Sequence, residues 1–524
     1  MVTKLALVFL LVAATVEIPR FGPVIWEDSD RKSIPEPSDR QVAEVWDFVT
    51  QTFIYPGAQL FDLPRNFRKL LRKPKEAQNT NNLDEVPNSS WFTNRNFLFP
   101  MSHGRIEKGP DQSAGPEQKG KWTITSCKTA GVTPGMRIKD SKGDTYLLKF
   151  DPPELPEMAT AADVIGAKFL YAAGYNVPEN YITYFDRDIL AANPELTCNI
   201  DELLKKVAVS PDERLRAVAS KFLSGKPKGP FSYLGVRPDD PNDKIDHEHR
   251  RELRGLRVIA SFINHTDVKD LNTLDTYVEE NGRKFLKHHL IDFGASLGSA
   301  SVRTKNAMHG HEYHFDTGEV MKSGLSLGIY RRPGECPARV LYPSIGYIEG
   351  FELEPQNWKP NYPVAAFENL TDRDAYWSAK IVAAFTDEQI AAAVDSGQYS
   401  NPEARRFLID KLIQRRNRIA DYWFRRVAPL DRFEVDARGL RFDDLAVLSG
   451  RDKAGNVRYR LEVRSEYASE VPTEFRPGAP VQILLTDSPV EARITRFSPG
   501  WPEQSVLVYL ARVEGIPTVV GIRR

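Results

Sequence analysis

The middle of the chain constrains the fold more than any other part. Apolar residues recur at helical spacing over 249–263, which predicts a half-buried helix. Two strand-like runs follow at 273–278 and 284–291, and the Asn-Gly pair between them is a hairpin signal. A polar loop, 265–272, joins the helix to the hairpin, and Asp-Phe-Gly at 292–294 follows the hairpin directly. With this order of elements, acidic and amide side chains lie on short loops next to a helix and a hairpin.

These two loops resemble the catalytic loop and the metal-binding loop of protein kinases, His-Arg-Asp-Leu-x-x-x-Asn and Asp-Phe-Gly. Asp267 and Asn272 have the five-residue offset of the kinase loop, and Lys269 lies between them. The resemblance implies that Asp267 is the catalytic base that orients an acceptor hydroxyl and that Lys269 is an auxiliary cation. It also implies that ATP is the phosphate donor and that Asn272 and Asp292 hold Mg²⁺ or Mn²⁺, since such hard cations prefer oxygen ligands.

Lys149 is the single lysine among the apolar residues of a strand-like run, Asp144–Phe150, which precedes a helical pattern at 158–173. In a kinase N-lobe such a lysine contacts the nucleotide phosphates and pairs with an acid of the next helix. Asp163 is the candidate partner and is one methylene shorter than glutamate, so the helix must approach more closely. Gly131 and Gly135 belong to a turn-rich segment whose backbone amides could cover phosphates. The alternative for Lys149 is an edge-strand lysine with its ammonium in water.

Three departures from the common kinase motifs narrow the set of kinases that the chain resembles. Thr266 replaces the Arg of the kinase loop, no Gly-x-Gly-x-x-Gly precedes Lys149, and no Ala-Pro-Glu follows Asp-Phe-Gly. The chain therefore resembles atypical kinases, such as HipA-like, spore-coat CotH-like, phosphoinositide-kinase-like and secretory-pathway kinases, more than the eukaryotic Ser/Thr and Tyr kinases. The resemblance implies an α+β, two-lobed kinase-like fold. Regulation through a pairing of that Arg with a phosphorylated activation loop is not expected.

The 524 residues and the 41% hydrophobic content are enough for about three domains. Lys+Arg and Asp+Glu are both 71, so the net charge does not indicate nucleic acid or an anionic membrane as an obligatory partner. After about residue 429, short strand-like runs alternate with Pro- and Gly-rich turns, which predicts a small β-sandwich or barrel. We expect a signal peptide at 1–14, an N-terminal extension at 15–120, a kinase-like N-lobe at 121–225, a helical C-lobe at 226–428 and an all-β domain at 429–524.

The first residues have the pattern of a bacterial-type export signal. A positive charge precedes an apolar run of ten, Leu5–Ala14, which ends in small residues and is too short to span a bilayer. No cysteine lies near the end of the run, so no stable membrane anchor is expected; the alternative is a buried N-terminal strand or helix. A periplasmic or secreted kinase needs a nucleotide source, because these compartments hold little ATP. Cys127, Cys198 and Cys336 are no disulfide framework, although one pair could bridge.

The N-terminal extension contains two notable stretches. The run 84–95 is polar and aromatic enough to be a binding loop, but we expect Trp91 and Phe92 to pin the extension onto the kinase-like body, since large aromatics mostly serve packing. The basic run Arg65–Lys75 is expected to be a solvated face.

A histidine-rich stretch offers a rival metal site. His309, His311 and His314 lie in the Gly- and Ser-rich segment 295–332, which is expected to face the substrate. Imidazole is a common zinc ligand. The His-x-His-x-x-His spacing does not match the His-Glu-x-x-His helix pattern, however, and no cysteine pair lies nearby.

Together these features predict an exported kinase-like phosphotransferase that moves the γ-phosphate of ATP to a hydroxyl of a protein, glycan or small molecule. The first alternative is a catalytically silent kinase-fold protein that binds a nucleotide or a partner. The shorter Asp163, the missing glycine loop and export favour it, whereas retention of Asp267, Asn272 and Asp292 opposes it. The second alternative is a metal-dependent hydrolase that uses the histidine-rich loop.

Overall fold

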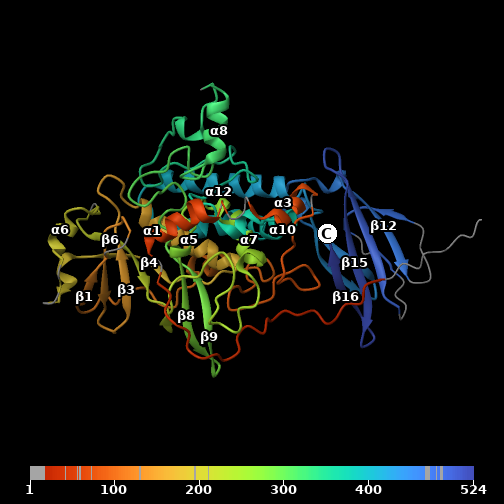
Figure 1. Ribbon diagram of the computed structural model, residues 1–524, viewed down its shortest axis with the longest axis horizontal. Coiled ribbons are helices and arrows are strands. Elements are labelled where there is room, and N and C mark those ends of the chain that lie inside the picture. Colours follow the sequence, from red (N-terminus) through yellow and green to blue (C-terminus); the bar gives the residue numbers. More distant parts are fainter. Residues whose placement is uncertain are drawn as a thin grey trace, which may run out of the picture. The chain divides into compact units, whose positions relative to one another are not determined.

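The computed structural model describes residues 18–524 except 42, 56, 58–60, 72, 129–130, 194–195, 197, 211, 328, 466–471, 479–480 and 484–487. The predicted signal peptide at 1–14 lies outside the described residues. The described chain is a mixed α/β protein (Figure 1). It forms two compact units: a larger unit, Trp26–Thr80 with Val86–Arg426, and a smaller unit, the described part of Met1–Ile25 with Asn81–Glu85 and Val427–Arg524.

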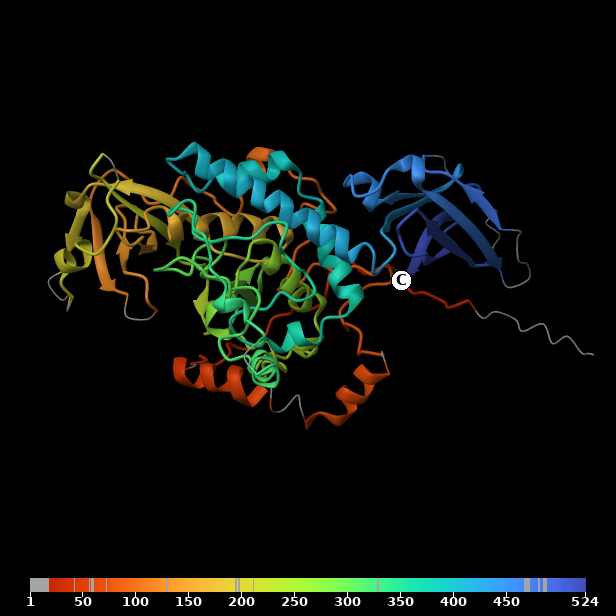
Figure 2. The same ribbon diagram turned by 90° about the horizontal axis from the view of Figure 1, so that it is seen from above.

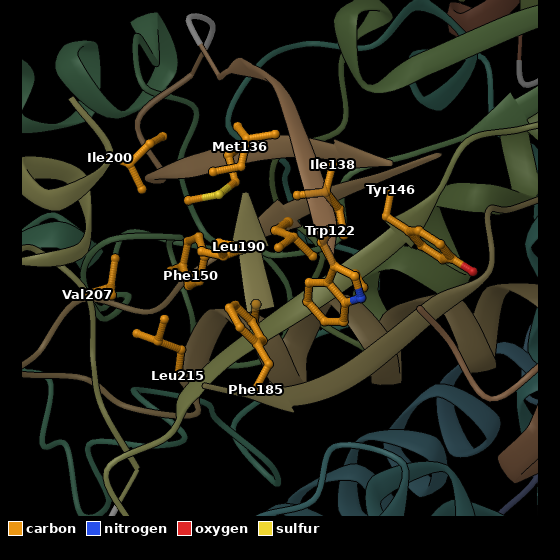
Figure 3. Packing of buried hydrophobic residues seen from close by; sticks show 14 of the residues in the cluster. Trp122, Met136, Ile138, Tyr146, Phe150, Phe185, Leu190, Ile200, Val207 and Leu215 are labelled. Carbon is orange, nitrogen blue, oxygen red and sulfur yellow. The ribbon is translucent and has the colours of Figure 1, made fainter. Parts of the chain in front are cut away.

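A six-stranded sheet of order β4-β6-β3-β2-β1-β5 lies in the larger unit, with antiparallel neighbours except for the parallel pair β1–β5. A disulfide joins Cys127, at the end of β1, to Cys198. Large apolar side chains from several strands pack together into a buried core beside the sheet (Figure 3). The strands are β1 (Trp122–Cys127), β2 (Gly135–Lys139), β3 (Thr145–Lys149), β4 (Asn180–Phe185), β5 (Leu190–Ala192) and β6 (Leu215–Lys221).

Lys149 does not lie on a sheet edge, because β3 pairs with β2 on one side and with β6 on the other. Its side chain is buried, so the edge-strand alternative is wrong. The next helix, α5 (Met158–Ala173), has the predicted bounds and is buried along nearly its whole length. Asp151 accepts hydrogen bonds from the backbone N–H groups of Ala159 and Thr160, at 2.7 and 2.9 Å, and so satisfies free donors of the first turn.

The predicted central helix and hairpin are present. The helix is α7 (Arg251–Phe262), and β8 (Thr273–Glu280) pairs with β9 (Arg283–Leu290) across Asn281 and Gly282. Both turn residues have positive φ, as the Asn-Gly hairpin signal requires. The short strand β7 (Lys226–Pro227) completes a three-stranded sheet.

The remaining helices of the larger unit are mostly short, and α10, α11 and α12 follow one another after the predicted substrate-facing loop. Part of that loop is itself helical, as α8. Among the described residues, no helix combines the length and the hydrophobicity needed to cross a bilayer. The helices are α1 (Glu44–Val49), the π-helix η1 (Thr50–Ile54), α3 (Leu63–Leu70), α4 (His103–Lys108), η2 (Arg187–Ile189), α6 (Ile200–Leu204), η3 (His247–His249), η4 (Asp270–Asn272), α8 (Thr317–Leu325), η5 (Pro333–Glu335), α9 (Ala365–Glu368), α10 (Asp372–Ala383), α11 (Asp387–Asp395) and α12 (Pro402–Trp423).

The expected packing role of Trp91 and Phe92 is confirmed. Both side chains are buried. The Trp91 ring stacks on His288 of β9 with ring centroids 3.5 Å apart, and the Phe92 ring lies 5.2 Å from that of Trp377 in α10. The extension is therefore fastened to the body by aromatic contacts.

The prediction that the basic run Arg65–Lys75 is a solvated face is wrong for helix α3. Arg65 and Arg68 are half-buried, and Arg65 donates to the amide oxygen of Asn369 at 3.3 Å and to the carbonyl of Glu368 at 3.1 Å. The exposed side of α3 carries apolar side chains instead.

The smaller unit holds a five-stranded antiparallel sheet, order β13-β12-β14-β15-β16, and a two-stranded ribbon, β10–β11. Two pieces of the predicted extension, 18–25 and 81–85, belong to this unit; for example, the N–H of Ile522 donates to the carbonyl of Asn82. The five-part division and the closed sandwich or barrel stay predictions. The elements are β10 (Leu430–Asp436), β11 (Gly439–Asp444), α13 (Leu445–Leu448), η6 (Ala454–Asn456), β12 (Arg458–Ser465), β13 (Thr473–Phe475), β14 (Val490–Phe497), β15 (Gln504–Val513) and β16 (Ile516–Arg523).

Candidate functional site

Lys149, Asp163 and Asp292 meet where β3, α5 and the turn after β9 come together. The ammonium nitrogen of Lys149 lies 2.6 Å from Oδ2 of Asp163 and 3.0 Å from Oδ1 of Asp292. The side chains of Lys149 and Asp163 are buried, whereas that of Asp292 is 45% exposed. The lysine is therefore held between an internal acid and an acid that also faces solvent.

The two acids keep Lys149 charged. Burial alone lowers the pKa of Lys149, but the carboxylates of Asp163 and Asp292 outweigh it and raise the pKa above its ordinary value. For Asp292, burial works to raise the pKa, but the charge and hydrogen bond of Lys149, with help from Lys128 and Lys269, lower it to about 2. At neutral pH the site therefore holds a permanent cation beside a permanent, partly exposed anion.

The short side chain of Asp163 reaches its partners because α5 packs closely against the Asp-Phe-Gly turn. Oδ1 of Asp163 accepts hydrogen bonds from the N–H of Phe293 and from the side-chain amide of Asn180, both at 3.0 Å. One turn further along α5, a Cβ at Gly166 would lie only 2.7 Å from Cβ of Phe293. The close approach that the shorter acid requires is thus permitted by a glycine, which the sequence analysis did not single out.

The loop that carries Asp267 is tied to this turn. The side-chain amide of Asn272 donates to the backbone carbonyl of Asp267 at 2.7 Å and to its Oδ2 at 3.0 Å. The ammonium of Lys269 lies 3.1 Å from the same Oδ2. The N–H of Ile291, the residue before Asp292, donates to the carbonyl of Asn272 at 3.0 Å. The two motifs therefore form one structural unit.

Two oxygens of this unit are suited to a hard cation. Within the described part of the chain, neither Oδ2 of Asp292 nor the amide oxygen of Asn272 accepts a hydrogen bond. A carboxylate and an amide oxygen are ligand types that Mg²⁺ and Mn²⁺ take, so the residues present fit the metal that the resemblance implies.

The glycines predicted to cover phosphates have different environments. Gly131 lies in the turn between β1 and β2 with a φ of +70°, so it remains a candidate for a phosphate-covering turn. Gly135 lies within β2, where a Cβ would come 2.5 Å from the carbonyl oxygen of Leu148 in the neighbouring strand. Packing of β2 on β3 accounts for Gly135 without a role at phosphates.

Lys128, in the same β1–β2 turn, is a site residue that the sequence analysis missed. Its charge helps to lower the pKa of Asp292, and its ammonium donates to the carbonyl of Thr133 at 3.1 Å. The sequence signal for Lys128 was its position directly after a strand, β1. That strand pairs with β2, which in turn pairs with β3, the strand that carries Lys149.

Buried polar groups make contacts at the start of the loop that carries Asp267. Burial lowers the pKa of His265 to about 4, so the ring is neutral at pH 7, and it packs edge-on to Phe293 with centroids 5.8 Å apart. Lys305, from the predicted substrate-facing loop, donates to the carbonyls of Asn264 and Leu297. No sequence motif marks Lys305, because its partners are backbone carbonyls, which any residue type supplies.

The histidine-rich loop does not bring its imidazoles to one point. His309 bonds to Asn306, His311 to Glu349 at 2.8 Å, and His314 packs on the ring of Tyr362. Among the described residues, the His, Cys and acidic ligand atoms that gather closely enough for a metal are those of Asp246, Glu248 and His249. The predicted zinc alternative at the histidine-rich loop is therefore wrong.

No protein-family model matches this chain. No curated protein matches it either. Among solved structures it is similar to the crystal structure of the Golgi casein kinase with Mn and ADP bound, at 11% identity and a TM-score of 0.28 over 75% of this chain and 94% of that chain. A second crystal structure of the Golgi casein kinase matches at 11% identity and a TM-score of 0.27, over 75% of this chain and 95% of that one.

Proposed function

We propose that this protein is an exported, kinase-like phosphotransferase that uses ATP with Mg²⁺ or Mn²⁺. One observation carries the proposal: Lys149 bonds to both Asp163 and Asp292, while the loop of Asp267 and Asn272 is joined to the same turn. A cation, a metal-type oxygen pair and a candidate base are the groups that phosphoryl transfer requires close together. In this proposal the six-stranded sheet belongs to the N-lobe and α7, α10, α11 and α12 belong to the C-lobe.

Each side chain has a role that follows from its contacts. Lys149, charged and oriented by two acids, would contact the phosphates. Asp292 and Asn272 would hold the divalent cation, which neutralises phosphate charge when bound. Asp267 would accept the proton of the acceptor hydroxyl, with Lys269 and Asn272 fixing its carboxylate.

Export is supported by two independent features. Residues 1–14 have the charge and apolar pattern of a signal peptide. Cys127 and Cys198 form a disulfide, and disulfides persist mainly in oxidising compartments outside the cytosol. The acceptor hydroxyl, on a protein, glycan or small molecule, would then be extracytoplasmic.

Phosphate transfer from radiolabelled ATP with Mg²⁺ or Mn²⁺ tests the chemistry. Wild type should label itself or an added acceptor, and Asp267→Asn should be slower by about 100-fold or more, because a general base contributes at least that much. Asp201→Asn is the matched control, since Asp201 is an exposed acid in the same unit that pairs with Arg187 on the surface. Equal transfer by wild type and Asp267→Asn would exclude Asp267 as the base.

Nucleotide binding separates the active protein from the silent kinase fold. At 100 times its dissociation constant, a nucleotide should add about 2.7 kcal/mol to the free energy of unfolding. Binding that depends on the metal and is weakened by Asp292→Asn, without transfer by wild type, would assign the silent function. Absence of any metal-dependent shift with ATP or GTP would refute the phosphotransferase and favour a silent kinase fold that binds a partner.

A further inference from the structure

Helix α3 turns its apolar face to solvent and its basic face toward the protein. The side chains of Leu63, Phe67 and Leu70 lie on one side of the helix, and those of Phe67 and Leu70 are 61% and 78% exposed. Arg65, on the opposite side, is half-buried against Glu368 and Asn369. A surface helix in water normally has the reverse orientation.

Three further elements add to this apolar surface. Trp46 of α1 and Phe53 of η1 are exposed, as are Val320, Met321 and Leu325 of α8. The rings of Phe53 and Phe315 lie 5.5 Å apart, so the N-terminal helices and the start of α8 are neighbours. Figure 2 shows α1, α3 and α8 along one edge of the larger unit.

The segment that contains α3 carries a net positive charge. From Phe61 to Lys75 the sequence holds six basic residues and one acid. Lys73 and Lys75, directly after α3, are exposed. Exposed Trp, Phe and Leu beside a basic segment are the composition of helices that lie in the interface of an anionic bilayer.

We propose that α1, η1, α3 and α8 form a membrane-binding surface that rests on an anionic lipid bilayer. The apolar side chains would enter the boundary between head groups and acyl chains, and the exposed lysines would lie against the anionic head groups. The contact is peripheral and independent of phosphoryl transfer.

The charge pattern favours a bilayer over a second copy of this chain. A two-fold dimer through this surface would place the same basic segment of each copy beside the other. Like charges would then repel at the contact, whereas an anionic bilayer neutralises them.

Flotation with lipid vesicles tests the proposal. The full chain is mixed with vesicles of phosphatidylcholine alone or of phosphatidylcholine with phosphatidylglycerol, and the bound fraction is measured for wild type, Phe67→Ser/Leu70→Ser and Phe351→Ser. Phe351 is the matched control, because it lies in the same unit, away from these elements in the sequence, and is 66% exposed. Since all variants keep residues 1–17, any contribution of that segment is common to them.

Wild type and Phe351→Ser should bind the anionic vesicles. The binding of Phe67→Ser/Leu70→Ser should be weaker by about tenfold or more. Lys73→Gln and Lys75→Gln should each weaken binding by about fivefold at low salt. Equal binding by the double variant, or no binding by wild type, would overturn the proposal. A dimer in light scattering that Phe67→Ser/Leu70→Ser abolishes, without vesicle binding, would also overturn it and assign the surface to a second copy. Unchanged thermal midpoints of the variants show that the loss is not unfolding.

Discussion

Replacing Gly166 by alanine tests the contact between α5 and the Asp-Phe-Gly turn. The added Cβ would lie 2.7 Å from Cβ of Phe293 and 3.3 Å from the hydroxyl of Ser296, whereas carbon atoms in contact prefer about 3.5–4.0 Å. Alanine gains about 1 kcal/mol over glycine in a helix interior. Overpacking a filled core costs about 1–3 kcal/mol. The free energy of unfolding should therefore fall by about 0–2 kcal/mol.

Gly324→Ala is the matched control for this measurement. Gly324 lies in α8 of the same unit, and a Cβ there meets nothing within 4 Å. It should keep the gain of about 1 kcal/mol, so the two variants should differ by about 1–3 kcal/mol in urea unfolding. If Gly166→Ala stabilises the protein as much as Gly324→Ala does, α5 does not pack against Phe293 as described.

Gly166→Ala should also change the geometry of the candidate site. Asp163 lies one turn before Gly166 and bonds to both Lys149 and the N–H of Phe293. Displacing α5 from the turn lengthens these contacts, so Gly166→Ala should weaken metal-dependent nucleotide binding in thermal-shift titrations. Asp163→Glu combined with Gly166→Ala should recover part of the loss, because the longer acid spans the wider gap.

Three further predictions concern stability. Replacing Cys127 and Cys198 by serine should cost about 4 kcal/mol, because the bridge closes a loop with a sequence separation of 71; reductant should have the same effect on wild type and none on the variant. Trp91→Ala should cost about 3–5 kcal/mol in urea unfolding, since the ring is buried and stacked on His288, and a cost below about 1 kcal/mol would contradict that packing. Burial lowers the pKa of His289 to about 3 from 6.5; because the folded pKa is the lower one, stability is retained above pH 6.5 and lost as the pH falls toward 3. Wild type should lose about 2 kcal/mol from this group between pH 7 and pH 5, and His289→Gln should be less sensitive to acid over the same interval.

Elements with a local signal could be predicted from the sequence. Helix α5 has the predicted bounds, and the hairpin turns at Asn281 and Gly282, because periodicity and turn chemistry are encoded within a few residues. Helix α8 was missed, because its residues lie in a Gly- and Ser-rich segment whose exposed apolar side chains follow no core-facing pattern. The inverted orientation of α3 was missed for a related reason, since an amphipathic pattern does not say which face meets the protein.

The site was predictable where a motif specifies residue type and spacing. Asp267, Asn272 and Asp292 could be chosen in this way, and the structure brings them together with Lys149. Gly166 could not be recognised, because its constraint comes from Phe293, which is far away in the sequence.

The shorter acid at Asp163 was one of three sequence arguments for a silent protein, and the packing of α5 answers this one. A carboxylate one methylene shorter than glutamate still reaches Lys149 at 2.6 Å, because Gly166 lets the helix lie against Phe293. The aspartate and the glycine are therefore two parts of one arrangement, and the departure from the kinase pattern is compensated within the same helix. What still favours the silent function is the missing glycine loop and the proposed export away from ATP. Export would limit the supply of nucleotide and not the chemistry of the site, so binding and transfer measured with added ATP address the site alone.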